Sequence, residues 1–132
     1  MVIFDSSVLV DQLRTACHIR RIAELEDLVR TSSVVLAELW RGSTTHAEAA
    51  FLRALERKYP IFTPTERNWL ESGEILMCIQ QDRGFEPRKL RDLHFDVLIA
   101  LTARTQGARL ITSNRADFEM IRKYRDFKLE VW

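Results

Sequence analysis

Residues 96–118, DVLIALTARTQGARLITSNRADF, carry three secondary-structure signals in immediate succession. The apolar positions before Gly107 follow a helical period and predict a helix over 92–106, which the glycine ends. The compact apolar run 108–112 has the length of a buried strand, and a further helix is expected over 115–123. A strand enclosed by helices in this way is typical of a parallel sheet covered on both faces.

The rest of the sequence repeats this alternation of short apolar runs and amphipathic helices. Strands are predicted at Val2–Phe4, in the first half of 31–42 with its turn near 35–37, at Ile61–Phe62 and over 127–132. Helices are predicted from Val8 with Ser6 or Ser7 as the cap, over 19–29, from Thr45 in capping-box spacing with Glu48, and over 65–81, before a loop at 83–90. This order predicts an α/β fold, a three-layer α/β/α sandwich around a central, mainly parallel sheet of about five strands.

The composition is that of a single globular domain. Of 132 residues, 46% are hydrophobic and only 4 are Gly and 3 Pro, so we expect one core and one domain over 1–132. No basic segment leads into an apolar leader sequence, and no apolar run approaches the roughly 20 residues of a membrane span. We therefore expect a cytoplasmic protein without a membrane segment.

Charge and cysteine content leave alternatives open. The net charge of +1 neither favours nor excludes nucleic acid, but 16 of the 20 basic residues are Arg, whose planar fork suits phosphate oxygens. A GC-rich genome produces the same bias. Cys17 and Cys78 lie in separate helical segments without CxxC spacing, and we expect buried free thiols, with a disulfide or a metal role as the alternative.

Acidic and amide side chains recur where strands end or helices begin. Asp5 follows the first strand, Glu38 lies in VVLAELW at the turn or first helical turn, and Asp96 opens the apolar run DVLIALTA. Asn114 and Asp117 follow the strand LIT. Each residue alone is explained as a cap or a first-turn charge, although the apolar neighbours of Glu38 leave it few solvated positions. Because ligands bind outside the carboxyl ends of parallel strands, the set together predicts one shared site.

Three segments together resemble a known family. VIFDSSVLV (2–10), SSVVLAELWRG (32–42) and residues 96–118, in this order and at these separations, closely resemble PIN-domain ribonucleases, and within them the VapC-type toxins of bacterial toxin–antitoxin pairs. The resemblance spans nearly the whole chain. Its most specific part is an Asp before an apolar helix, then Gly, an apolar strand and T.N..DF. It implies a PIN-like fold.

The resemblance also implies a metal-dependent endoribonuclease. The implied metal-binding and catalytic residues are Asp5, Glu38, Asp96 and Asp117, and the supporting residues are Ser6, Thr112 and Asn114. Asn114 brings no charge to a family position that is acidic, so it competes with Asp117 for the fourth place. Asp92 is interpreted as an outer acid or, more simply, as a helix cap. Oxygen-only ligands favour Mg²⁺ or Mn²⁺ as the cofactor.

An RNA substrate and an antitoxin partner follow from the same resemblance. Relatives cut structured RNA such as transfer or ribosomal RNA, are held by a VapB-like antitoxin that covers an apolar groove, and commonly form homodimers. The candidates for phosphate contact are Arg14, Arg41, Arg88, Lys89, Arg91 and Arg115, with solvated surface charge as the alternative for each. Trp40 and the helix face 69–77 are candidates for antitoxin contact, with core packing as the alternative.

Two rival functions remain open. The first is a PIN-fold module that no longer cuts and instead binds RNA or protein; Asn114 favours it, and the intact acids Asp5, Glu38 and Asp96 oppose it. The second is a receiver-like phosphoacceptor. It is disfavoured because the first strand lacks a paired-acid motif and the chain lacks a suitably placed late lysine.

Overall fold

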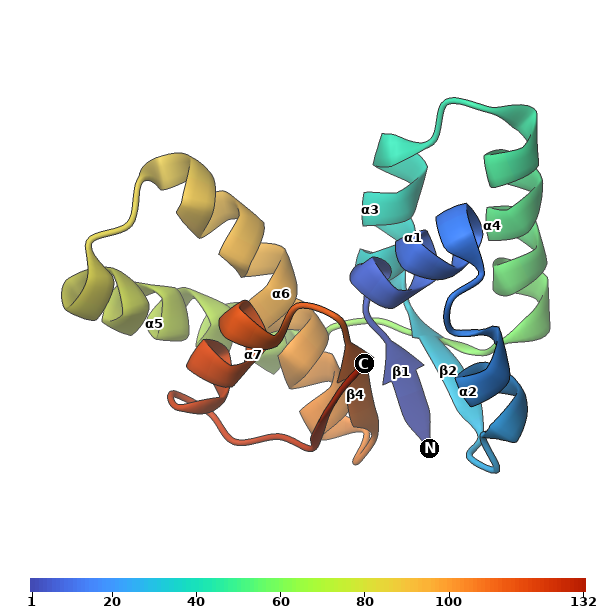
Figure 1. Cartoon of the computed structure of the whole chain (residues 1–132). Coiled ribbons are helices and arrows are strands. Elements are labelled where there is room, and N and C mark those ends of the chain that lie inside the picture. The colour runs from blue at the N-terminus through green and yellow to red at the C-terminus, as the bar shows by residue number, and fades with distance from the viewer.

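The computed structural model describes all 132 residues, in five strands and seven helices. The strands are β1 (Val2–Phe4), β2 (Val29–Ser32), β3 (Ile61–Phe62), β4 (Arg109–Thr112) and β5 (Leu129–Val131). The helices are α1 (Ser6–Thr15), α2 (Ile19–Glu24), α3 (Ser33–Gly42), α4 (His46–Lys58), α5 (Glu66–Arg83), α6 (Pro87–Thr105) and α7 (Arg115–Arg122). Their order along the chain is the predicted one (Figure 1).

The strands form one parallel sheet in the order β3-β2-β1-β4-β5. Ile3 of the central strand pairs with Arg30 on one side and with Leu110 on the other. Helices α1 to α4 lie on one side of the sheet and α5, α6 and α7 on the other (Figure 1). The α/β class and the three-layer arrangement are confirmed, and the sheet is parallel throughout.

The direction of strand addition reverses beside β1. From β1 the chain passes through β2 to β3, then crosses back to β4 and continues to β5. Because such crossovers are right-handed, the two directions place their helices on opposite faces, and a crevice opens beyond the carboxyl ends of β1 and β4. Asp5 follows β1 directly and Asn114 follows β4 closely, so both residues lie at this crevice.

The second strand starts earlier than predicted. The expected helix 19–29 ends at Glu24, because Val29 joins the sheet opposite Val2. The following helix α3 consequently begins at Ser33, capped by the Ser32 hydroxyl, which accepts from the Val34 amide at 3.1 Å. Glu38 therefore lies well inside α3, and its predicted place at a turn is wrong.

Two helix starts also differ from the prediction. The helix α6 begins at Pro87, where a proline loses no intrahelical hydrogen bond, so Asp96 lies in mid-helix and Asp92 is no cap. The cap of α1 is Asp5 itself, whose carboxylate accepts from the Ser7 amide at 3.4 Å; the predicted serine caps are wrong. The Thr45 cap of α4 is confirmed.

The hydrophobic core is centred on β1, β4 and the second half of α6. Its most central members are Val2, Ile3, Val97, Leu98, Ile99, Leu110 and Ile111, all at most 1% exposed. Two exposure patterns bear on the predictions. Trp69, Leu70 and Met77 of α5 point to solvent, and the predicted burial of Cys17 and Cys78 is wrong, since both are exposed free thiols. No helix combines the length and apolar character needed to cross a membrane.

Candidate metal centre and active site

Three of the predicted acids converge at the crevice. Asp5 comes from the end of β1, Glu38 from α3 and Asp96 from α6. Carboxylate oxygens of all three lie within 4.8 Å of one another. Since α3 and α6 belong to opposite helical layers, the sheet and both layers each contribute one acid (Figure 1). The sequence placed these residues near one another correctly; their role as metal ligands stays a prediction.

Asp5 is held on one of its two oxygens. The carboxylate is 2% exposed, and its Oδ2 accepts hydrogen bonds from Ser7 Oγ at 2.6 Å and from Thr112 Oγ1 at 2.9 Å. The other oxygen, Oδ1, meets only the Ser6 hydroxyl, at 3.5 Å. One oxygen of Asp5 is therefore fixed by hydroxyl donors, and the second remains available to a cation.

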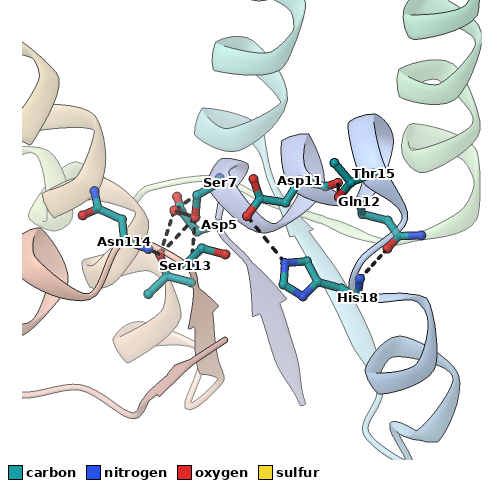
Figure 2. Close-up of polar contacts among 9 residues, drawn as sticks. Asp5, Ser7, Asp11, Gln12, Thr15, His18, Ser113 and Asn114 are labelled. Atoms are coloured by element: carbon teal, nitrogen blue, oxygen red, sulfur yellow. Dashed lines mark hydrogen bonds and ion pairs between the residues drawn. The ribbon is translucent and has the colours of Figure 1, made fainter.

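The turn after β4 completes this arrangement. Ser7 Oγ accepts from the Ser113 amide at 3.0 Å, and Thr112 Oγ1 accepts from the Asn114 amide at 2.9 Å, so both hydroxyl protons are directed to Asp5 (Figure 2). The sequence indicated Thr112 as a supporting residue and left open whether Ser6 or Ser7 steadies the Asp5 carboxylate; in the structure Ser7 makes the closer contact, at 2.6 Å against 3.5 Å for Ser6.

The pKa values of two acids in the cluster are raised, because burial and the neighbouring carboxylates outweigh the nearby positive charge. Burial and the Asp5 carboxylate raise the pKa of Glu38 to about 7, although Arg41 opposes the shift. Burial, Asp5 and Glu38 raise the pKa of Asp96 to about 8. At the observed spacing each pair of carboxylates repels by about 3 kcal/mol at an effective dielectric near 20. Asp96, and in part Glu38, therefore retain protons at neutral pH unless a cation joins them.

A divalent cation fits the residues that are present. Glu38 Oε1 is buried without any hydrogen-bond partner, which is costly for a carboxylate oxygen unless a cation lies beside it. The three side chains offer only oxygen atoms, the ligands that Mg²⁺ and Mn²⁺ prefer. Asp5, Glu38 and Asp96 can accordingly hold such an ion.

The two candidates for the fourth acidic position, Asn114 and Asp117, both bind other residues of the chain. Both oxygens of Asp117 lie 2.9 Å from Lys89 Nζ, an ion pair that the sequence did not reveal. Asn114 caps α7 by accepting from the Asp117 amide, and its Nδ2 donates to Asp117 Oδ2 at 3.1 Å. Asp117 is close enough to raise the pKa of Asp96, but it lies outside the group of three acids that can share one ion.

Two hollows meet at Arg41. A cleft of about 570 Å³ is lined by Ser6, Arg14, Glu38 and Arg41 among others, and so reaches the edge of the acid cluster. A second hollow, of about 440 Å³, is lined by Arg41, Arg88, Arg91, Asp92, His94 and Phe95. The Arg41 guanidinium stacks on Phe95 at 5.1 Å from the ring centre. Arg115 lines neither hollow and pairs with Glu119 at 3.1 Å.

Ser7→Ala is expected to weaken Mg²⁺ or Mn²⁺ binding roughly 10–100-fold, the effect typical of removing a side chain that orients a metal ligand. The variant loses the shortest hydrogen bond to Asp5 and leaves the Ser113 amide without its acceptor. Isothermal titration calorimetry measures the affinity. Ser33→Ala, whose hydroxyl contacts Thr63 instead, is the matched control. Equal affinities of the two variants would contradict the orienting role.

Comparison with known proteins adds a family and a fold. The family model described as PIN domain matches residues 2–124. No curated protein matches the chain in sequence. Among solved structures, DNA-bound VapBC from Salmonella typhimurium is 20% identical with a TM-score of 0.75, over 100% of this chain and 99% of that chain.

Two further solved structures have the same architecture. VapBC-1 from nontypeable Haemophilus influenzae is 22% identical with a TM-score of 0.74, over 100% of this chain and 98% of that chain. A toxin–antitoxin complex from Klebsiella pneumoniae is 19% identical with a TM-score of 0.62, over 89% and 90%. At these identities the likeness shows the fold.

Proposed function

Because the chain belongs to the PIN-domain family, we propose that it is a metal-dependent endoribonuclease, the VapC-type toxin of a toxin–antitoxin pair, built as a single PIN domain over 1–132. The family match ends at residue 124, and the pairing of β5 with β4 supports including the remaining residues. The proposed ligands are Asp5, Glu38 and Asp96, with Asp117 as an additional acid at the edge of the site.

The observation that carries this proposal is the cluster of three acids at the crevice. Three carboxylates share one crevice, two of them retain protons near neutral pH, and Glu38 Oε1 is buried without a partner. Phosphodiester hydrolysis needs an activated water and compensation of charge on the phosphate. A divalent ion supplies both when bound.

The side chains of this protein hold the reacting groups in place. Ser7 and Thr112 fix one oxygen of Asp5, and the other oxygen has only one long hydrogen bond, from the Ser6 hydroxyl. Arg41 lines both hollows, where its planar guanidinium can donate hydrogen bonds to phosphate oxygens of a bound RNA strand. The stack on Phe95 limits the freedom of Arg41 and so reduces the entropy lost on binding.

An antitoxin partner is supported by the solved structures and by an apolar groove. The structures similar to this chain are VapBC and toxin–antitoxin complexes. A groove of about 300 Å³ is lined mostly by apolar side chains, among them Phe4, Leu9, Ile22, Val29 and Phe51. Trp40 is half-buried and donates to Glu56 at 2.7 Å, which favours its packing role over antitoxin contact. The exposed Trp69, Leu70 and Met77 remain available for antitoxin contact.

Purified chain without antitoxin is expected to cut total RNA into discrete fragments with Mg²⁺ or Mn²⁺ and to leave it intact with chelator. Structured RNA, transfer or ribosomal, is the expected target, and sequencing of fragment ends identifies the cut. Re-addition of metal after chelation must restore cleavage. Cleavage that persists with chelator, or no cleavage with either Mg²⁺ or Mn²⁺, would contradict the proposal of a metal-dependent nuclease.

The alternative function is a weakened RNA- or protein-binding module. It is supported by Asn114, which carries no charge, and by the Lys89–Asp117 ion pair, which occupies the carboxylate of Asp117. The site then has no free fourth acid. Such a module would bind RNA with the same affinity whether metal is present or not, and would not cut it. Filter binding and cleavage, measured on the same RNA, separate the two functions.

Arg41→Glu is expected to weaken RNA binding and to flatten its salt dependence by about 0.7–0.9 in slope for each phosphate contact that is lost. Binding is measured over a series of salt concentrations by fluorescence anisotropy with the uncleaved RNA in chelator. Arg57→Glu, an exposed charge on α4 outside both hollows, is the matched control. Equal losses in the two variants would show a general charge effect instead of a contact by Arg41.

A further inference from the structure

A second group of metal-ligand side chains lies at the far end of α1. Asp11 belongs to the helix, and Cys17 and His18 follow where the chain turns towards α2. Their ligand atoms lie within 4.8 Å of one another. In Figure 2 the carboxylate of Asp11 faces the ring of His18, apart from the Asp5 group. The three side chains offer oxygen, sulfur and nitrogen.

The imidazole ring of His18 is held in one orientation, but its Nε2 atom makes no hydrogen bond. The residue is 8% exposed, and its Nε2 is buried without a hydrogen-bond partner. The ring packs against Trp132 at 5.4 Å between centres, and the His18 amide donates to Gln12 Oε1 at 3.1 Å. A buried ring nitrogen that is fixed in place and makes no hydrogen bond calls for an explanation, and a bound ion supplies one.

The distance between His18 and Asp11 fits a shared metal ion better than a hydrogen bond. His18 Nε2 lies 3.6 Å from Asp11 Oδ2, beyond the range of about 2.7–3.2 Å for a hydrogen bond. Two ligands bound to one tetrahedral zinc ion, each about 2.0–2.2 Å from it, lie about 3.4 Å apart. A small movement therefore places both atoms on one ion.

We propose that Asp11, Cys17 and His18 bind one zinc-class divalent ion, at a site separate from the acid cluster. The thiolate and imidazole ligands select zinc over Mg²⁺, which prefers oxygen. Three protein ligands leave a fourth position to water or to a side chain from a partner. Because Cys17 is exposed, the ion has a direct path from solvent.

The bound ion would stabilise α2, a helix with little packing of its own. α2 has only six residues, none of them buried, and its cap residue His18 makes no capping bond through its side chain. Ile22 of this helix lines the apolar groove proposed for the antitoxin. Zinc binding thus fixes one wall of that groove by joining α2 to α1.

The test is zinc binding by the reduced, chelator-treated full chain in a large excess of Mg²⁺. Competition with a chromophoric zinc indicator is expected to show one zinc per chain, and Co²⁺ in place of zinc to give a thiolate charge-transfer band. Cys17→Ser should lower the affinity by more than about a hundredfold and abolish the band. This variant is the main probe, because an exposed Cys tolerates serine without a packing cost.

Two controls locate the ion. Cys78→Ser, the other exposed thiol, should bind zinc like the unaltered chain. The triple variant Asp5→Asn, Glu38→Gln, Asp96→Asn should keep zinc while losing Mg²⁺-dependent cleavage. No zinc binding in excess Mg²⁺, binding unchanged in Cys17→Ser, or binding lost only in the triple variant overturns the proposal. The readout is binding, so failure of the nuclease proposal leaves this result interpretable.

Discussion

Asp96→Asn is expected to reduce metal-dependent RNA cleavage by on the order of a thousandfold, because it removes a charged ligand whose loss forfeits several kcal/mol of transition-state stabilisation. The metal-free variant should be at least as stable as the unaltered chain. Burial and the neighbours Asp5, Glu38 and Asp117 raise the pKa of Asp96, so a permanently neutral side chain of the same shape spares the folded chain the cost of holding this acid protonated. Cleavage gels and thermal unfolding in chelator measure the two effects.

The control for this variant is Asp92→Asn, an exposed acid one helical turn earlier on α6. It should retain most of the cleavage activity and the unfolding temperature. If Asp96→Asn instead lowers the unfolding temperature in chelator, Asp96 has a structural role, and the metal-ligand assignment fails.

The second large effect is a steep rise of Mg²⁺ affinity with pH. The pKa of Glu38 is about 7 and that of Asp96 about 8 in the metal-free fold, so at pH 6 both carboxylates hold protons that the ion must displace. Affinity is expected to fall by more than about a hundredfold from pH 8 to pH 6, since each displaced proton contributes up to about tenfold per pH unit.

The same shifts set the stability of the metal-free chain. Below the unfolded pKa values, near 4, both states are protonated and the stabilisation is fully present. As the pH rises from about 4 to about 7 to 8, the folded chain holds protons that the unfolded chain has already lost, so the free energy of unfolding falls over this range and levels off above it. Added Mg²⁺ should therefore raise the unfolding temperature most at pH 8.

Calorimetric titration in two buffers of different ionisation enthalpy counts the protons released at pH 6 to 7. One to two protons per Mg²⁺ are expected, and fewer for Asp96→Asn. Binding without proton release would contradict the raised pKa values. Arg41→Glu provides an internal check, because Arg41 opposes the rise at Glu38 and its loss should increase the release.

The sequence predicted the layers of the fold and the meeting of the three acids. Short apolar runs that end on Asp5 and before Asn114 carried this information, because parallel strands deliver the residues after their carboxyl ends to one edge of the sheet. The exact start of β2 could not be predicted. Val29 belongs to the strand only because it pairs opposite Val2, a contact between distant segments that local periodicity does not contain.

Pairings between distant side chains were missed for the same reason. The link from Ser7 through Ser113 to the turn after β4 and the Lys89–Asp117 ion pair both join residues far apart in sequence. The exposure of Trp69 on α5 was also unpredictable, because the helix buries Asn68 and Ser72 through specific hydrogen bonds to Thr105 and His94. A rule that counts only apolar residues assigns the wrong face to such a helix.

The central position of β1 bears on the timing of activity during synthesis. During synthesis β1 is made well before its neighbour β4, and Thr112, which holds Asp5, ends β4. A nascent or prematurely released chain that stops before residue 109 has an unpaired edge where the site should form. The proposed nuclease would therefore have a complete metal site only after β4 has been synthesised.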